Sequence, residues 1–204
     1  MTDIFDSKQV TKPPHRLAIF GGSFDPVHRG HIESAQAIAS NLDLDQIRFM
    51  PCGSHAFKGA FQFSDELRLS MLTAVLNDTR FEIDTREIER PTTSYTIDSC
   101  REIRSEVGDA TVLGLVIGDD LLSSLHRWKE WESLLDVVNL VVMNRAQDEL
   151  DDERGQDLSA KVKAALSNSV GRMTKPSGEV VTLELPTVHV SSSAIRKICL
   201  LYTS

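Results

Sequence analysis

Apolar residues along this chain gather in short runs separated by longer, mixed segments. Two runs, 111–117 and 137–143, are too uniformly apolar for half-exposed strands, and they predict strands buried in a parallel sheet. Shorter or more mixed runs predict four further strands, the last of them at a sheet edge. These lie at 16–20, 46–50, 81–83 and 179–184.

The segments between the strands carry apolar residues three and four positions apart, which is typical of helices. Ser64, followed by two acidic residues, predicts the start of one helix. The pattern predicts helices at 30–40, from 64, at 95–107, as short pieces within 119–135, at 158–166 and at 191–200. This alternation indicates an α/β fold with a doubly wound parallel sheet, which takes ligands at the carboxyl ends of its strands. We expect one domain over 16–204 and a flexible leader over 1–15.

Residues 20–31, Phe-Gly-Gly-Ser-Phe-Asp-Pro-Val-His-Arg-Gly-His, join the first strand to the first helix. Gly21 and Gly22 let the backbone approach a ligand closely, and amides at a helix start attract phosphate. His28 and His31 lie three residues apart on one face of that start. The combination predicts a nucleotide phosphate site. A plain tight turn, a surface histidine pair or two metal ligands are the alternatives, although no suitable third ligand is obvious nearby.

Composition narrows the function classes. The 204 residues are 41% apolar and 25% charged, as in an ordinary globular domain, and no run is long enough to span a bilayer. The net charge of −8 argues against a general nucleic-acid binder. The polar first residues do not resemble a signal peptide, and Cys52, Cys100 and Cys199 lack metal-ligand spacing, so we expect reduced thiols in the cytoplasm. The cations expected to face phosphates are Lys58, Arg145 and Arg196.

The segment 20–31 resembles the G-x-F-D-P-x-H-x-G-H signature of the H-x-G-H nucleotidyltransferases, which implies their Rossmann-like fold. Residues 190–196, Val-Ser-Ser-Ser-Ala-Ile-Arg, resemble the I-S-S-T-x-I-R element that holds the ATP triphosphate in these enzymes. Hydroxyls at a helix start and a forked guanidinium suit phosphate oxygens. The alternative for this element alone is a simple helix cap with a solvent-facing arginine.

Two further segments resemble bacterial nicotinate-nucleotide adenylyltransferase. Residues 94–98 resemble its S-Y-T-x-x-T-L element, and residues 117–120 with Trp128 and Trp131 resemble I-G-x-D-x(7)-W-x-x-(W/Y). In that family an aromatic ring stacks on the pyridine, which by position would be Trp128 here, and amides near the Tyr-Thr pair take its carboxylate. The alternative is that both tryptophans anchor a helix in the core, and for Trp131 we favour it.

The resemblance covers residues 16 to about 199 and implies adenylyl transfer from ATP to nicotinate mononucleotide, which gives deamido-NAD and pyrophosphate. Mg²⁺ is expected to arrive with ATP and not on protein ligands. The implied residues fall into a catalytic, an ATP-binding and a mononucleotide-binding group. The catalytic group is His28, His31, Lys58 and Arg196. The ATP-binding group is Gly21, Gly22, Ser23, Phe24, Gly118, Asp120, Ser191, Ser192 and Ser193. The mononucleotide-binding group is Ser94, Tyr95, Thr96, Trp128 and Arg145. In this set Asp120 would accept a ribose hydroxyl, whereas Asp119 is interpreted as a helix cap.

The chain departs from the family at two places. The family's Pro-Pro-His-Lys is here Ser54-His55-Ala56-Phe57-Lys58, so that Phe57 replaces a histidine and His55 lies two places early. The family continues into another helix after the I-R element, whereas this chain ends at Ser204. Arg145 matches the family's V-x-x-R pattern, with an exposed strand-end arginine as the alternative. Other functions left open are a superfamily transferase acting on nicotinamide mononucleotide, phosphopantetheine or a cytidylyl donor, and a non-catalytic nucleotide sensor.

Overall fold

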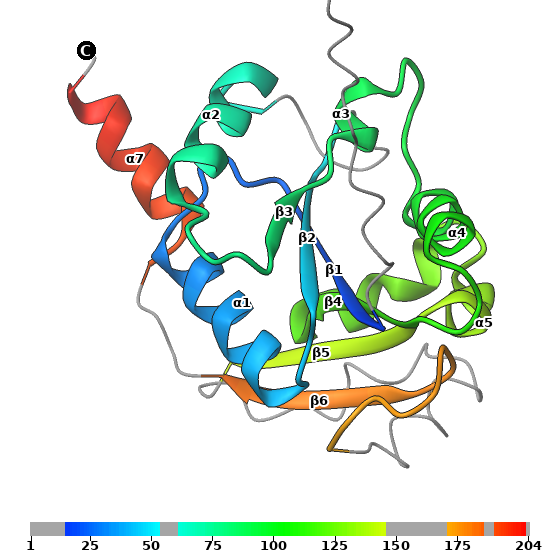
Figure 1. Ribbon diagram of the computed structural model, residues 1–204. Coiled ribbons are helices and arrows are strands. Elements are labelled where there is room, and N and C mark those ends of the chain that lie inside the picture. Colours follow the sequence, from blue (N-terminus) through cyan, green and yellow to red (C-terminus); the bar gives the residue numbers. More distant parts are fainter. Residues whose placement is uncertain (1–14, 54–60, 146–170, 186–189, 203–204) are drawn as a thin grey trace, which may run out of the picture.

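The computed structural model describes residues 15–53, 61–145, 171–185 and 190–202. Six parallel strands form one sheet with helices on both faces (Figure 1). The strands are β1 (Arg16–Gly22), β2 (Gln46–Pro51), β3 (Phe81–Ile83), β4 (Val112–Gly118), β5 (Asn139–Arg145) and β6 (Val180–Leu185). The helices are α1 (Arg29–Asn41), α2 (Asp65–Val75), α3 (Arg86–Glu89), α4 (Thr96–Val107), α5 (Leu134–Val137) and α7 (Ser192–Tyr202), with 3-10 turns η1 (Asp119–Arg127) and η2 (Trp131–Ser133).

The strand order is β3-β2-β1-β4-β5-β6, and every neighbouring pair is parallel. The chain builds outward from β1 to β3 and then returns to β4 on the other side of β1. The order therefore reverses between β1 and β4, where open α/β sheets bind ligands. In the register, Phe20 of β1 lies opposite Phe49 of β2 and Val116 of β4. The predicted doubly wound sheet is confirmed.

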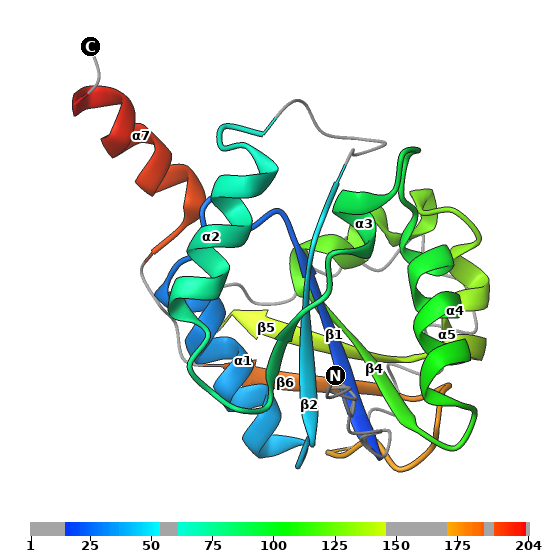
Figure 2. The ribbon, with the colours of Figure 1, turned by 45° about the horizontal axis from the view of Figure 1, so that its top comes forward.

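Alternating side chains of the strands fill two separate cores. Leu17 and Ile19 of β1 pack on the face covered by α4, α5 and η1. Ala18 and Phe20 pack on the opposite face with α1 and α2. Figure 2 shows α1, α2 and α7 on one side of the sheet and α4 and α5 on the other. Strands buried on both faces explain the uniformly apolar runs in the sequence.

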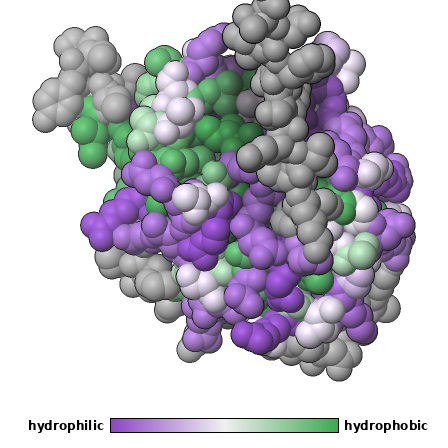
Figure 3. Space-filling view, in the orientation of Figure 1, coloured by the Kyte–Doolittle hydropathy of each residue, from purple (hydrophilic) through white to green (hydrophobic). Residues whose placement is uncertain are grey.

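Most element boundaries lie within one or two residues of the predicted ones. The side chain of Ser64 accepts the Leu67 N–H at the start of α2, so the predicted cap is confirmed. The edge strand is present as β6, whereas α3 was not predicted. The predicted helix at 158–166 and residues 1–14 of the leader lie outside the described residues. The face in Figure 3 is largely hydrophilic, apart from an apolar area in the region of α2 and α7, where Leu67 and Ile198 are exposed.

Candidate active site

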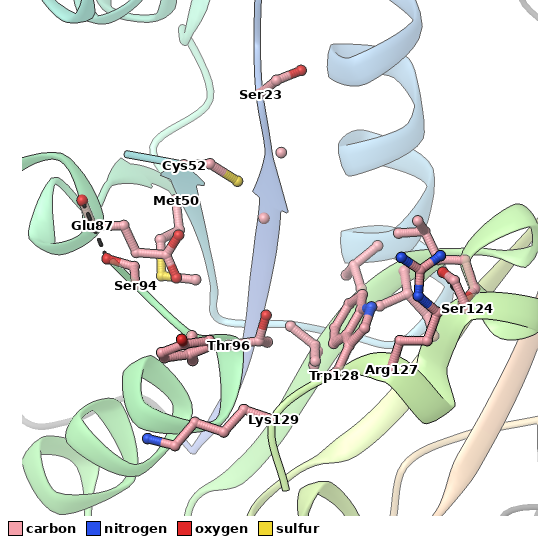
Figure 4. A pocket seen from close by; sticks show the side chains of 17 residues that line it. Ser23, Met50, Cys52, Glu87, Ser94, Thr96, Ser124, Arg127, Trp128 and Lys129 are labelled. Atoms are coloured by element: carbon pink, nitrogen blue, oxygen red, sulfur yellow. Dashed lines mark hydrogen bonds between the residues drawn. The ribbon is translucent and has the colours of Figure 1, made fainter. Parts of the chain in front are cut away.

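A pocket of about 330 Å³ opens at the carboxyl ends of β1, β2 and β4, at the point where the strand order reverses. Its walls come from strand ends, the start of α4 and the η1 region (Figure 4). It is lined by Gly21, Gly22, Ser23, Met50, Cys52, Glu87, Ser94, Tyr95, Thr96, Leu115, Val116, Ile117, Leu121, Ser124, Arg127, Trp128 and Lys129. Seven of the predicted ligand-binding residues are in this set, drawn from three separate parts of the chain.

Trp128 and Trp131 differ in their position relative to the pocket. Trp128 ends the η1 turn and lines the pocket, and Figure 4 shows it across the pocket from Glu87, Ser94 and Met50. Trp131 is partly buried against the same core and is not among the lining residues of the described chain. This packing agrees with the interpretation of Trp131 as a core residue, while Trp128 combines partial burial against that core with a place on the pocket wall.

The start of α4 faces the pocket with Ser94, Tyr95 and Thr96. The first amides of a twelve-residue helix carry partial positive charge and suit a carboxylate. Lys129 also lines this rim, where its Nζ is paired with the Asp98 carboxylate at 2.9 Å and lies 5.0 Å from the centre of the Tyr95 ring. This wall can therefore hold a flat ring with an acidic substituent.

Glu87 is the buried acid of the pocket. It is 6% exposed, its Oε1 accepts the Ser99 hydroxyl at 2.8 Å, and its backbone carbonyl accepts the Ser94 hydroxyl. Burial raises the pKa of the Glu87 carboxyl, although the Ser99 hydrogen bond and the Arg90 charge favour its ionised form.

Gly53, which follows β2, packs closely against the backbone of α3. A β-carbon on Gly53 would lie 2.0 Å from the Glu87 carbonyl oxygen, so only glycine lets these two segments pack so closely.

His28 and His31 lie at the start of α1, as the sequence predicted. Their ring centres are 3.8 Å apart, and the backbone N–H of His28 donates to Nδ1 of His31 at 3.2 Å. An imidazole that accepts at Nδ1 carries its proton on Nε2. Behind it, the Phe24 ring packs 5.0 Å from the His31 ring, centre to centre. His31 is therefore held in one orientation with Nε2–H as a donor.

The start of α7 lies against the β1–α1 turn. The Ser192 hydroxyl donates to the Pro26 carbonyl at 2.9 Å, and the Arg196 guanidinium donates to the Asp25 carbonyl. Ser191 accepts the Ala194 N–H, so it caps the helix. The tertiary structure therefore places the predicted hydroxyl–arginine element beside the turn that carries the histidines, 160 or more residues earlier in the chain.

The comparisons with known proteins agree with this geometry. The sequence model of the cytidylyltransferase-like family matches residues 19–198. A probable nicotinate-nucleotide adenylyltransferase of Chromobacterium violaceum is 37% identical over 187 residues, covering 89% of this chain and 85% of the relative. The chain belongs to the nicotinate-nucleotide adenylyltransferases. A Legionella pneumophila relative of the same name is 43% identical over 134 residues, covering 65% of this chain and 63% of its own. The solved Plasmodium falciparum nicotinic acid mononucleotide adenylyltransferase, in complex with NaAD, shares the fold with a TM-score of 0.64 and 20% identity, covering 89% of this chain and 82% of its own.

Some residues implied by the adenylyltransferase resemblance lie away from the pocket. The Phe24 side chain is fully buried in the core, so only its backbone is available to ATP. Gly118 ends β4 and Asp120 follows it, and a β-carbon on Gly118 would lie 2.2 Å from Oδ1 of Asp120, which folds over it. Asp119, interpreted as a cap, is buried, and its Oδ1 accepts the Asp120 N–H.

Two of the predicted cations stay untested by this geometry. Lys58 lies outside the described residues, together with Phe57 and His55. Arg145 ends β5 opposite Leu185 of β6, and its side chain is outside the described part. The roles implied for both residues therefore remain predictions.

Sequence reasoning missed several residues of this adenylyltransferase site. Arg127 and Lys129 directly flank Trp128 in the sequence, and two basic residues beside that tryptophan were the available signal. Cys52 follows β2, so its place at a strand end was a weaker signal. Arg68 gave no signal, because an arginine in the middle of an amphipathic helix is usually exposed.

Arg68 is fully buried and holds the pocket from behind. Its guanidinium donates to the carbonyls of Ser23 at 2.6 Å and Cys52 at 2.8 Å, two residues that line the pocket. It also pairs with Asp65 at 2.6 Å and lies 4.0 Å from the centre of the Phe61 ring. One side chain of α2 therefore fixes the loops that follow β1 and β2.

Within the described ranges, no three His, Cys, Asp or Glu side chains converge so as to hold a metal ion. Across the same ranges, no helix has the length and apolar character needed to cross a bilayer. We therefore assign none of the described residues to a metal.

Proposed function

We propose that this protein transfers the adenylyl group of ATP to nicotinate mononucleotide, forming deamido-NAD and pyrophosphate. One observation carries the proposal: the start of α4 and Trp128, a wall suited to a pyridine ring, share a pocket with the glycine-rich turn Gly21–Ser23. That turn leads directly to the histidine pair. A pyridine nucleotide and a polyphosphate can therefore lie side by side with their phosphates meeting at the turn.

The reaction asks for alignment and charge stabilisation. An oxygen of the mononucleotide 5′-phosphate forms a bond to the α-phosphorus of ATP, and the bond from that phosphorus to the bridging oxygen of pyrophosphate breaks. The attacking oxygen is already ionised at neutral pH, so no general base is required. We propose that the amides of Gly21–Ser23, the imidazoles of His28 and His31 and the Arg196 guanidinium stabilise the charge that develops, which the fixed orientation of the His31 ring and the contact of Arg196 with the β1–α1 turn support. Lys58 is proposed to join them.

The pocket favours the acid over the amide form of the pyridine. Trp128 is proposed to stack on the ring, a contact worth about 1–3 kcal/mol by analogy with nucleobase stacking. The amides at the start of α4 favour a carboxylate. Ser191, Ser192 and Ser193 are proposed to bind the ATP phosphates and Asp120 a ribose hydroxyl, while Arg145 is proposed for the mononucleotide.

Mg²⁺ is proposed to arrive with ATP, held by phosphate oxygens and water as is usual for this ion. The buried free thiol of Cys100 fits a reducing compartment, and we propose that the enzyme works in the cytoplasm.

The test is a panel of acceptors with ATP and Mg²⁺, read by pyrophosphate release and by chromatography of the dinucleotide. We expect kcat/KM for nicotinate mononucleotide to exceed that for nicotinamide mononucleotide and phosphopantetheine by about tenfold or more, since each 1.4 kcal/mol of preference is tenfold. A preference for nicotinamide mononucleotide would overturn the proposed acceptor. ATP binding by calorimetry with no product from any acceptor would instead identify a sensor.

A further inference from the structure

Asp25 is a buried carboxylate at the junction of three chain segments. It is 6% exposed and lies in the turn between β1 and α1. Its Oδ2 accepts the backbone N–H of Gln62, and its Oδ1 accepts the N–H of Phe63, both at 2.9 Å. A buried carboxylate needs such partners, because an uncompensated charge is costly away from water. The segment that leads into α2 is thus tied to the turn that carries the histidines.

The third segment at Asp25 is α7. The Arg196 Nη1 donates to the Asp25 carbonyl and lies 3.8 Å from its Oδ2, while Nη2 donates to the Ser193 hydroxyl at 3.0 Å. The Ser192 hydroxyl adds a bond to the next carbonyl, that of Pro26. The Arg196 side chain keeps 30% of its surface exposed, so a ligand can still reach it.

We propose that Asp25 is a positioning residue, which orients the Arg196 guanidinium toward the ATP polyphosphate without touching the reacting atoms. The inference rests on the proposed function. An arginine side chain is flexible, and its ordering on binding costs free energy unless it is held beforehand. Asp25 holds it electrostatically and through its own carbonyl. Both carboxylate oxygens also accept amide protons from residues 62–63, which compensates part of the cost of the buried charge and fixes its position beside Arg196.

A purely structural role for Asp25 makes a different prediction. If the carboxylate only tied residues 62–63 to the turn, its loss would lower stability and weaken both substrates. If it acts through Arg196, its loss affects ATP selectively, and the effect disappears once Arg196 has been removed. A double-mutant cycle separates the two roles, since coupled residues show non-additive effects.

The experiment compares wild type, Asp25→Asn, Arg196→Ala and the double variant. Asparagine has the size of aspartate but no charge. Its NH₂ group would face the backbone N–H of Gln62 or Phe63, which is also a donor, so one of these two hydrogen bonds is lost. We expect Asp25→Asn to lower kcat/KM for ATP by about tenfold or more, as small misplacements of binding groups do, with KM for the mononucleotide within about twofold. In the Arg196→Ala background the same change should alter kcat/KM by less than about twofold. Asp45→Asn is the matched control, because the Asp45 carboxylate also accepts a backbone N–H, that of Arg16, but at the end of β1 away from the pocket.

Equal losses in the two backgrounds, or parallel losses for both substrates, would overturn the proposal. If circular dichroism shows Asp25→Asn to be unfolded, Asp25→Glu replaces it in the cycle, because it keeps the charge but shifts the carboxylate by one methylene. ATP dissociation constants measured by calorimetry complete the same cycle without turnover. A wild type that binds ATP but forms no dinucleotide would contradict the proposed function, and the cycle would still decide the role of Asp25.

Discussion

The backbone N–H of His28 donates to Nδ1 of His31, and the two rings lie 3.8 Å apart between centres. This bond does more than begin a helix, because it places the His31 proton on Nε2. The local sequence spacing of the two histidines thus sets a donor orientation as well as a position.

Replacing His31 by asparagine or glutamine separates these two roles. The asparagine amide oxygen lies near the place of Nδ1 and still accepts the His28 N–H, whereas the glutamine amide nitrogen lies near the place of Nε2. We expect His31→Asn to keep its melting temperature and lose about 100-fold in kcat, as when an oriented transition-state donor is removed. His31→Gln should retain more turnover. Unchanged kcat at saturating ATP in His31→Asn would exclude His31 from the mechanism.

Trp128 and Trp131 form a matched pair, because both pack against the same core but only Trp128 is among the described residues that line the pocket. Trp128→Ala removes the stacking surface, so KM for nicotinate mononucleotide should rise about 5- to 150-fold, the equivalent of about 1–3 kcal/mol. Trp128→Phe should keep part of the stacking surface and therefore raise this KM less than Trp128→Ala does. Trp131→Phe should lower the melting temperature and leave KM unchanged. Steady-state kinetics and thermal unfolding provide both readouts, and equal KM effects from the two positions would contradict the assignment.

Arg68 gives a stability prediction. Truncation by Arg68→Ala leaves the Ser23 and Cys52 carbonyls without their donor, at a cost of about 1–3 kcal/mol for each buried group. Denaturant unfolding should show this loss, together with a raised KM for both substrates. Arg29→Ala is the control, since that side chain is 81% exposed in its pair with Glu33, and exposed pairs contribute at most about 1 kcal/mol. A loss for Arg68→Ala no larger than for Arg29→Ala would disprove the role.

Glu87 should make stability depend on pH. Burial raises the pKa of its carboxyl in the folded protein, although Ser99 and Arg90 oppose the shift. The native state therefore keeps the proton after the unfolded chain has released it, so this group's contribution to stability falls as pH rises from the unfolded pKa through the folded one. Glu87→Gln removes that fall. Its free energy of unfolding relative to wild type should increase as the pH rises above about 4.3, the ordinary pKa of a glutamate in an unfolded chain. A pH-independent difference would contradict the assignment, with exposed Glu82→Gln as the control.

Local sequence patterns were sufficient to predict the strands, the parallel character of the sheet and the motifs, but not the order of the strands. Uniformly apolar runs predict buried parallel strands because both faces of such strands pack against helices. The predicted phosphate-binding residues of Gly21–His31 lie within one short segment between β1 and α1. Trp128 and Trp131 lie three residues apart in one motif, and the sequence already predicted that only the first faces the pocket. These signals are readable because their physical causes lie within a few residues of chain.

The tertiary structure alone decided which distant groups meet. Only the reversal of strand order between β1 and β4 brings the start of α4 to the turn after β1. Only the docking of α7 sets Arg196 on Asp25, and only the buried position of α2 turns Arg68 toward two carbonyls. Phe24, a motif residue, proved to be core because its ring fills the space under Gly22. Such contacts depend on long-range packing, which no local pattern encodes.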